Sequence, residues 1–377
     1  MFSFARHSKS KISNWWWTVD KVSFSLAVFL IFIGAMLVLS ASPSAAHRDR
    51  LADDFAFIKK QGVFIFMGLV LMIGVSMQSL RTIRRLAVFG FLCAFAGVVL
   101  TYVVGDATKG AARWIKFAGF SLQPSEVIKP VFIVVTAWLL DANKRIEDFP
   151  GMTLAVGLFL LTALSVFGQP DLGMTVLISG VWALQMVWAG IPVWLIMTLF
   201  SAGLVLVTGS YFFLAHVRDR IDRFLASENE IGSQIQKSMD AFANGNLLGR
   251  GPGEGYVKMT LPDVHTDFIF ALAGEECGVW LTTIIVAAFA AIVVRSMTLS
   301  MRDNNLFVMY AASGLAASLG GQAIVNMCSA LQLMPAKGMT LPFVSYGGSS
   351  MLASCLAMGM LLAITRKNAA AEDKDNG

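Results

Sequence analysis

The sequence predicts an all-α, polytopic membrane protein with about ten transmembrane helices, and three observations predict this class. Of the 377 residues, 56% are hydrophobic and only 14% are charged, whereas about 25% of the residues of a soluble domain are charged. Apolar segments close to the roughly 20 residues that cross a bilayer recur along the whole chain. Lys and Arg cluster in alternate connections between these segments, as they do when every second loop is cytoplasmic.

The candidate spans leave one long polar connection. The spans are residues 23–42, 62–79, 85–104, 127–141, 152–168, 171–188, 193–215, 270–294, 307–331 and 348–366. Only Ala189-Gly190-Ile191-Pro192 separates the sixth from the seventh, so the number of spans in residues 171–215 depends on this break. Residues 216–267, between the seventh and eighth spans, are longer than a connection needs, and loops of that length are usually functional or disordered.

The basic connections predict that both termini are cytoplasmic. The inner segments then contain the Lys and Arg residues at 6–11, 81–85, 144–145, 295–302 and 366–367. We expect a cytoplasmic tail at 1–22, a membrane domain at 23–366 with its large loop, about 216–267, outside, and a cytoplasmic tail at 367–377. The long polar loops place the chemistry on the outer face.

Composition argues against several other classes of protein. The net charge of +5 comes from basic residues that are spread between apolar spans, so nucleic acid is a poor explanation for it. The four cysteines all fall in apolar segments, and their spacing indicates neither a disulfide framework nor a metal site.

The motif His265-Thr266-Asp267 ends the long loop where the chain re-enters the membrane. An ionisable side chain at that depth is costly and therefore marks a candidate functional site. A carboxylate at the lipid–water boundary can take a proton from a hydroxyl group while the rest of the substrate stays in lipid. The alternative is that Thr266 or Asp267 caps the following helix, and the two roles can coexist. His265 is expected to support the loop.

A second group of charged residues lies around the fourth span. Glu126 and Lys129 are three residues apart, so they share a helix face and can pair. Lys129 would lie about one turn inside the membrane, where a charge tends to face a cavity. Arg113 precedes them in a polar segment. The alternative is a pair that neutralises itself and caps the helix, with Pro124 in the first turn.

Two further segments combine polar residues with helix breakers. Gln169 and Asp171, between two short spans, could line a midplane cavity or form a tight outer turn in which Asp171 caps the next helix. Residues 334–350 contain two prolines and three glycines. There Lys337 could meet an anionic group, while the alternative is a re-entrant structural hairpin.

The remaining motifs are weaker. The run Gly249 to Gly255 lacks the Lys-Ser/Thr of a phosphate-binding loop and is interpreted as a flexible turn. Glu275 and Glu276 cannot both face one side of a cavity, and either is a candidate for a buried structural carboxylate. No His, Cys and Asp residues have zinc-site spacing, and no nucleophile elbow is present.

Together these motifs resemble the SEDS family of bacterial peptidoglycan polymerases (shape, elongation, division and sporulation proteins). The resemblance covers nearly the whole membrane region. It rests, in order, on residues 110–129, Gln169-Pro-Asp-Leu-Gly173, residues 234–238 with the Gly-rich run, Leu261-Pro-Asp-Val-His-Thr-Asp-Phe268 and Leu341-Pro-Phe-Val-Ser-Tyr-Gly-Gly-Ser-Ser350. The segment that begins at Lys337 looks like the division members rather than the elongation members. Met259 departs from the pattern, which has an acidic residue there.

The resemblance implies ten transmembrane helices and glycosyl transfer on lipid II, a disaccharide-pentapeptide attached to undecaprenyl pyrophosphate, with Asp267 as the catalytic residue. It implies location at the division septum in the cytoplasmic membrane. It also implies assembly with a class B penicillin-binding protein, a transpeptidase, alongside other division membrane proteins.

The expected reaction is inverting polymerisation with a new β-1,4 bond, in which Asp267 is the base. Arg113, Lys129 and Lys337 would meet the charge of the leaving pyrophosphate, with Arg218, Arg223 and Lys237 behind them, and Glu126 would orient Lys129. The other candidates for substrate binding are Gln169, Asp171, His265, Thr266 and Ser345. No cofactor is expected to bind firmly, although Mg²⁺ or Mn²⁺ would suit the pyrophosphate.

Two other functions stay open on sequence grounds. Charged residues beside interrupted helices also suit a lipid II flippase, but a flippase should expose polar groups to both faces, and here the inner loops are merely basic. A non-catalytic division scaffold that recruits a transpeptidase would not need Asp267.

Overall fold

The computed structural model describes residues 11–48, 52–104, 106–108, 111–117, 120–169, 171–213, 218, 234, 236–302, 304–334 and 338–367. Within them, each of the ten predicted spans coincides with one long helix. These helices are α2 (Lys21–Arg48), α3 (Ala56–Ser76), α4 (Leu80–Val104), α5 (Pro124–Arg145), α6 (Gly151–Gly168), α7 (Leu172–Trp188), α8 (Val193–Phe213), α10 (Ile269–Ser300), α11 (Leu306–Ala330) and α12 (Gly348–Ile364). In this part of the chain, six helices are long and apolar enough to cross a membrane: α2, α3, α4, α6, α10 and α11. The protein is therefore a multi-pass membrane protein.

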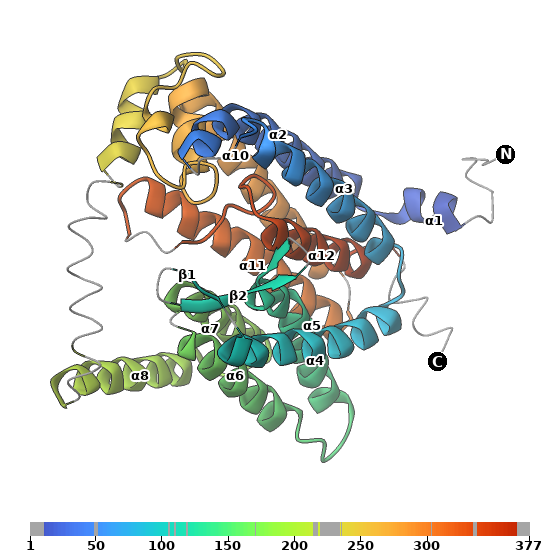
Figure 1. The fold of residues 1–377 in the computed structure, drawn as a ribbon. Helices are drawn as coiled ribbons and strands as arrows, with labels where there is room; N and C mark the ends of the chain where they lie inside the picture. Colours follow the sequence, from blue (N-terminus) through green and yellow to red (C-terminus); the bar gives the residue numbers. More distant parts are fainter. Residues whose placement is uncertain are drawn as a thin grey trace.

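Two groups of helices lie on either side of a central pair (Figure 1). α11 and α12 lie between α2, α3 and α10 on one side and α4 to α7 on the other, while α8 extends away from the bundle. α5 is buried along most of its length by α4, α11 and α12, although it contains several charged residues. A charged helix is tolerated here because other helices, rather than lipid, surround it.

The break between the sixth and seventh spans forms two helices, as predicted. α7 ends at Trp188 and α8 begins at Val193, and Gly190 between them has a φ of 96°. This left-handed backbone conformation favours glycine and ends the helix.

The sequence analysis did not predict a small β-sheet or a short N-terminal helix. Three antiparallel strands in the order β1-β2-β3 follow α4: β1 (Asp106–Thr108), β2 (Ala111–Phe117) and β3 (Phe120–Leu122). Residues 11–18 of the predicted tail form α1 (Lys11–Thr18). The strands are too short for a periodic pattern to be visible in the sequence.

Basic side chains gather at one end of the bundle. Arg295, in the C-terminal part of α10, pairs with Asp20, just before α2, at 2.7 Å. Arg145, at the end of α5, donates to the side chain of Asn305, just before α11, at 3.1 Å. Arg84, in the first turns of α4, lies over the ring of Phe307 at the start of α11. The N-terminal end of α10, where the His-Thr-Asp motif lies, is at the other end.

The part of the long loop that follows residue 235 packs on a kink in α10. Gly278 interrupts this helix with φ 71° and ψ −165°, a conformation that is essentially restricted to glycine. The kink leaves the carbonyls of Glu275 and Glu276 without helical partners, and they accept from the amides of Arg250 and Gly251 at 3.0 and 2.9 Å. The Gly-rich run therefore supplies hydrogen-bond donors to the two carbonyls that the kink frees. Buried backbone carbonyls need such partners, because leaving them unpaired is costly.

Glu275 and Glu276, each a candidate for a buried structural carboxylate, both bind neighbouring groups in this way. The Glu275 carboxylate accepts from the amides of Tyr256 and Val257 at 2.8 and 2.9 Å. The Glu276 carboxylate pairs with Lys258 at 2.8 Å, and both side chains are buried.

We expect Gly278→Ala to destabilise the protein by about 2–3 kcal/mol, because it combines a forbidden backbone conformation with a steric clash. A Cβ atom there would lie 2.4 Å from the carbonyl oxygen of Leu247. Gly157→Ala in α6 is the matched control, since a Cβ there meets nothing within 4 Å. Thermal melting of both variants in detergent checks this, and an equal melting temperature for the two would contradict it.

Candidate functional site

Asp267 ends a tight turn whose backbone is fixed from within. The carbonyl of Asp263, which has a φ of 51°, accepts from the amides of Thr266 and Asp267 at 3.1 and 3.0 Å. α10 begins only at Ile269, and its N-cap is Phe268, with no side-chain cap. The expectation that Thr266 or Asp267 caps this helix is therefore wrong. The Thr266 hydroxyl donates back to the carbonyl of Asp263 instead, at 3.1 Å.

Two side chains tie this turn to the segment before α12. Asn326, on α11, donates to the carbonyls of Asp267 and Met339 at 2.9 and 2.7 Å. Ser345 donates to the carbonyl of Thr266 at 2.6 Å, and its oxygen accepts from the amide of Leu341 at 2.8 Å. Asn326 and Ser345 each bond to both the turn and the segment before α12. These hydrogen bonds fix the backbone on both sides of the Asp267 carboxylate.

The segment before α12 also passes directly beside the carboxylate. A Cβ atom at Gly338, which has a φ of 63°, would lie 3.8 Å from Oδ2 of Asp267. Lys337, a predicted site residue and the preceding residue in the chain, lies outside the described residues, as does Arg223.

His265 packs rather than pointing into open space. It is 9% exposed, and its ring lies 4.5 Å from that of Phe57 and 5.4 Å from that of Tyr346, measured between centroids. Its carbonyl accepts from the amide of Tyr346 at 2.8 Å. These contacts agree with the expected role of supporting the loop.

Glu126 and Lys129 form the predicted pair, and it is buried. Their side chains approach to 2.7 Å and are only 8% and 5% exposed. The Lys129 ammonium also donates to Oε1 of Gln322 on α11, whose amide nitrogen donates to the carbonyl of Thr340 at 3.0 Å. Pro124 occupies the first turn of α5, as expected.

One face of α11 connects this pair to Asp267. Gln322, which binds Lys129, and Asn326, which binds the backbone of Asp267, are four residues apart in one helix. Residues at this spacing are neighbours on a helix face, with their Cβ atoms about 5–6 Å apart. The structure therefore brings Glu126, Lys129 and Asp267 around one helix face, although they are up to 141 positions apart in the sequence.

Arg113, Gln169 and Asp171 form a second group. Nη1 of Arg113 lies 3.4 Å from Oδ2 of Asp171, and its Nε donates to the carbonyl of Gln169 at 2.9 Å. Oδ1 of Asp171 accepts from the amide of Met174, so the alternative in which Asp171 caps α7 is confirmed. The Gln169 side chain donates to the hydroxyl of Thr101.

The β-sheet connects the second group to the first. Arg113 lies on β2, which pairs with β3, and the chain then passes through Gln123 into α5, where Glu126 and Lys129 lie. The hydroxyl of Ser349, at the start of α12, accepts from the amide of Gln123 at 2.9 Å. The strands thus place Arg113 at the same end of the bundle as Asp267.

The remaining predicted basic residues lie apart from these groups. Lys237 donates to the carbonyl of Thr260 at 3.1 Å in an exposed position. The guanidinium group of Arg218 lies 5.9 Å from the ring centroid of Tyr211 in α8.

Gln322 and Asn326 are the residues of the candidate site that sequence reasoning missed. Both are amides in the C-terminal half of an apolar helix, spaced by four, and both are buried. Polar side chains inside a membrane are expensive and usually face the bundle interior. That signal was present in the sequence.

We expect Asn326→Leu to lower the free energy of unfolding by about 2–3 kcal/mol, because it leaves two buried carbonyls without a donor at a cost of about 1–3 kcal/mol each, partly relieved by relaxation. Ser313→Ala, on the same helix, is the control, since its hydroxyl donates only within α11. Melting temperatures in detergent distinguish the two, and a variant as stable as its control would refute the anchoring role.

No dedicated metal cage is visible in the described part of the chain, where no three His, Cys, Asp or Glu side chains come together.

Comparison with known proteins decides the family. The model of a family described as "Cell cycle protein", whose name joins FtsW, RodA and SpoVE, matches residues 20–370. The chain belongs to this FtsW/RodA/SpoVE family. It is the SEDS family that the sequence motifs resemble.

Relatives within the family are similar over almost their whole length. A "Probable peptidoglycan glycosyltransferase FtsW" of Caulobacter vibrioides is 40% identical over 365 residues, which cover 97% of this chain and 94% of that protein. A protein of the same name from Geobacter metallireducens is 36% identical over 361 residues, 92% of this chain and 95% of the relative.

Solved structures of family members show the same fold. A chain in a study of how a peptidoglycan synthase complex coordinates polymerisation and crosslinking superposes with a TM-score of 0.76 at 25% identity, covering 92% of this chain and 97% of that one. RodA of Thermus thermophilus superposes with a TM-score of 0.69 at 24% identity, covering 93% and 97%.

Proposed function

We propose that this protein is a peptidoglycan glycosyltransferase that polymerises lipid II into glycan strands for septal wall synthesis. The observation that supports this most strongly is the position of Asp267. Its backbone amide and carbonyl are both fixed, and it lies at the end of the bundle opposite to Arg84, Arg145 and Arg295. The relatives' names give the same activity for proteins up to 40% identical.

The proposed reaction forms one C–O bond and breaks another. The 4-hydroxyl of an acceptor N-acetylglucosamine attacks the anomeric carbon of N-acetylmuramic acid, while the bond from that carbon to the pyrophosphate oxygen breaks. Asp267 takes the proton of the hydroxyl, and undecaprenyl pyrophosphate leaves. Attack opposite an α-linked leaving group gives the β-1,4 bond, so the step inverts. A positioned base typically contributes about 10²–10⁴-fold to such a step.

Lys129 and Arg113 differ in burial, and we therefore propose different roles for them. The Lys129 ammonium is 5% exposed and already bound by Glu126 and Gln322, whereas the Arg113 side chain is 25% exposed. We therefore assign contact with the leaving pyrophosphate first to Arg113, together with Lys337. Lys129, which binds the face of α11 that also holds Asp267, is assigned a positioning and electrostatic role. A preorganised charge inside a low-dielectric site can act without touching the substrate.

A divalent cation fits this proposal only as a companion of the pyrophosphate. Mg²⁺ commonly binds through one or two carboxylates and substrate phosphates, and keeps several waters. The turn contains the carboxylates of Asp263 and Asp267, which is within the one or two that such a cation commonly uses. Chelation with EDTA followed by Mg²⁺ or Mn²⁺ add-back tests whether the cation is required.

We propose that the protein is an inner-membrane protein of the septum with both termini in the cytoplasm and its active site outside. The gathering of basic side chains at the end away from Asp267 supports this orientation. A class B penicillin-binding protein is the proposed partner, with other division membrane proteins around it. The solved complex that couples polymerisation with crosslinking supports such a pairing.

Polymerisation of labelled lipid II tests the proposal. The purified protein is combined with its cognate transpeptidase, whose own active site is inactivated, and a moenomycin-type inhibitor silences contaminating polymerases. Glycan ladders are expected. Their absence from an intact complex, with transbilayer movement of lipid II in proteoliposomes instead, would replace the polymerase with a flippase.

A further inference from the structure

Residues 256–261 of the long loop, which we call the approach segment, lead into the turn that ends at Asp267. The segment contains the short 3-10 helix η1 (Val257–Met259). Only Pro262 separates it from Asp263, whose carbonyl accepts from the amide of Asp267. Because the proline ring fixes the backbone torsion φ, a displacement of the approach segment passes on to Asp263 and its hydrogen bond. The approach segment therefore helps to set the position of Asp267.

The amide end of the approach segment is fixed to α10. The Glu275 carboxylate accepts from the amides of Tyr256 and Val257 at 2.8 and 2.9 Å. The Glu276 carboxylate pairs with the side chain of Lys258 at 2.8 Å. Both glutamates are buried beside the kink in α10. These contacts leave the carbonyl end of the segment to be held by another element.

That element is α2, through Arg48, its last residue. Nη1 of Arg48 donates to the carbonyl of Leu261 at 2.8 Å. Its Nη2 donates to the carbonyls of Met259 and Lys258 at 3.2 and 3.3 Å. Among the described residues no other donor binds these three carbonyls. A guanidinium group has several N–H donors in one rigid plane, so a single arginine can bridge the carbonyls along this end of the segment.

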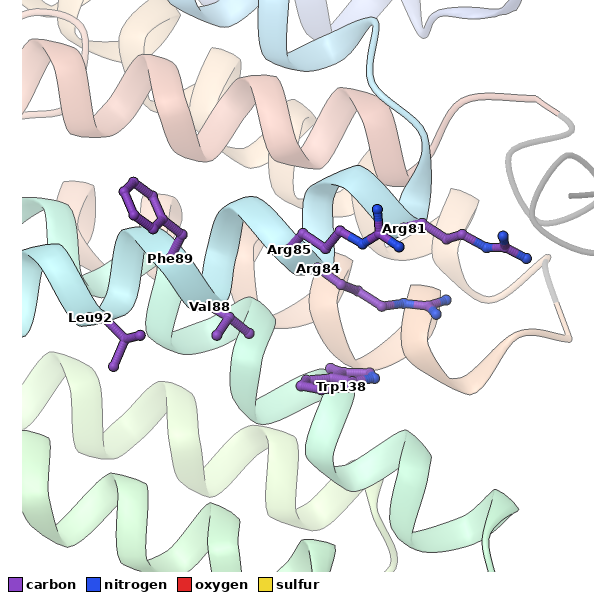
Figure 2. A pocket seen from close by; sticks show the side chains of 7 residues that line it. All are labelled: Arg81, Arg84, Arg85, Val88, Phe89, Leu92 and Trp138. Atoms are coloured by element: carbon purple, nitrogen blue, oxygen red, sulfur yellow. The ribbon is translucent and has the colours of Figure 1, made fainter. Parts of the chain in front are cut away.

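Neither membrane orientation nor the helix dipole accounts for these contacts. Basic residues are favoured in cytoplasmic connections, and Figure 2 shows Arg81, Arg84 and Arg85 of α4 extending toward one end of their helix. Arg48 lies at the opposite end of the bundle, because α2 begins beside Arg295 and its 28 residues span about 40 Å. The dipole of α2 favours a cation in its last turn, but it does not direct that cation to carbonyls 210 positions away in sequence.

We propose that Arg48 is a positioning residue for the polymerisation reaction. It holds the approach segment, and through Pro262 and Asp263 it keeps the Asp267 carboxylate aligned with the acceptor hydroxyl. Arg48 acts through the backbone and does not contact the reacting atoms. A catalytic group displaced by about 1 Å can lose about 100-fold in rate, so a contact of this kind matters for turnover. The inference rests on the proposed role of Asp267.

The kinetics of labelled lipid II polymerisation by the full-length protein with its cognate transpeptidase give the first test. Arg48→Gln should lower kcat by about 10–100-fold and leave KM within about threefold, because a displaced base weakens the transition state and not substrate binding. Arg48→Lys keeps the charge, but one ammonium group cannot bridge the same carbonyls, so it should recover only part of kcat. Lys60→Gln removes an exposed charge near the start of α3, at the same end of the bundle. It is the matched control and should keep the wild-type kcat.

Hydrogen exchange of the approach segment and the turn, measured by mass spectrometry, gives a second test that does not depend on catalysis. The amides of Leu261 and Asp267 donate to the carbonyls of Val257 and Asp263. Arg48→Gln should speed their exchange by about tenfold or more, the contribution expected of a hydrogen bond from a charged donor. Arg48 is exposed, so the melting temperature of the variant should stay close to that of wild type.

Unchanged exchange in Arg48→Gln, beside a wild type that polymerises lipid II, would overturn this inference and leave the proposed function standing. A raised KM with an unchanged kcat would also overturn it, because Arg48 would then contact the substrate. So would an equal loss of kcat in Lys60→Gln, or full recovery of kcat by Arg48→Lys while exchange stays fast, since charge alone would then carry the effect. A wild type that makes no glycan would instead contradict the proposed function, and this inference with it.

Discussion

Asp267→Asn is expected to slow glycan polymerisation by about 10²–10⁴-fold, the usual contribution of a general base. The substitution keeps the shape of the side chain and the backbone bonds to Asp263 and Asn326, and removes only the proton acceptor. A sugar hydroxyl is a weak nucleophile at neutral pH, so an amide cannot replace the carboxylate. Gel analysis of glycan strands from labelled lipid II measures the rate.

Asp263→Asn is the matched control, because it removes the same charge four residues earlier in the same turn. Asn tolerates the φ of 51° at this position. Its rate should stay within a few-fold of wild type. If both variants lost activity equally, the effect would come from the local charge of the turn rather than from a base at Asp267.

Glu126→Leu is expected to destabilise the protein by about 3–5 kcal/mol, because it leaves the ammonium of Lys129 buried without its counter-charge. The pair is 2.7 Å apart and nearly inaccessible. Lys59 and Asp53 form a pair of similar length, 2.6 Å, but their side chains are 68% and 45% exposed. Asp53→Leu should therefore leave the melting temperature unchanged within error.

The double variant Glu126→Leu/Lys129→Met separates folding from catalysis. Replacing both partners of a buried pair by apolar groups of similar size is often neutral for stability, so its melting temperature should return close to that of wild type. Its polymerisation rate should stay low, because the variant removes the charge that binds Gln322 on the face of α11 that holds Asp267. A double variant with wild-type activity would make the pair purely structural.

The sequence was enough to predict the helices because each one contains a mainly apolar segment, and lipid admits few other structures. It was also enough to predict the Glu126–Lys129 pair and to offer the Asp171 cap as one of two alternatives, because both contacts join residues three apart in sequence. These features are local, and a helix converts sequence spacing directly into contact.

Non-local features could not be predicted in this way. The alternative that Thr266 or Asp267 caps α10 was wrong, because the N-cap of this helix is Phe268. Asn326 and Ser345, which are distant in sequence, also hold the turn. The kink at Gly278 depends on amides supplied by residues 250 and 251. Such partners are visible only once the chain has folded.

The central claim is that Asp267 acts in the chemical step, and its most direct test is the rate of polymerisation by Asp267→Asn as lipid II concentration rises to saturation. We predict that the rate stays at least 100-fold below wild type at saturation, with the half-saturating concentration little changed. A base lost from the transition state lowers kcat without weakening substrate binding. A rate that returned to the wild-type value at high lipid II would contradict the account, because Asp267 would then only bind the substrate.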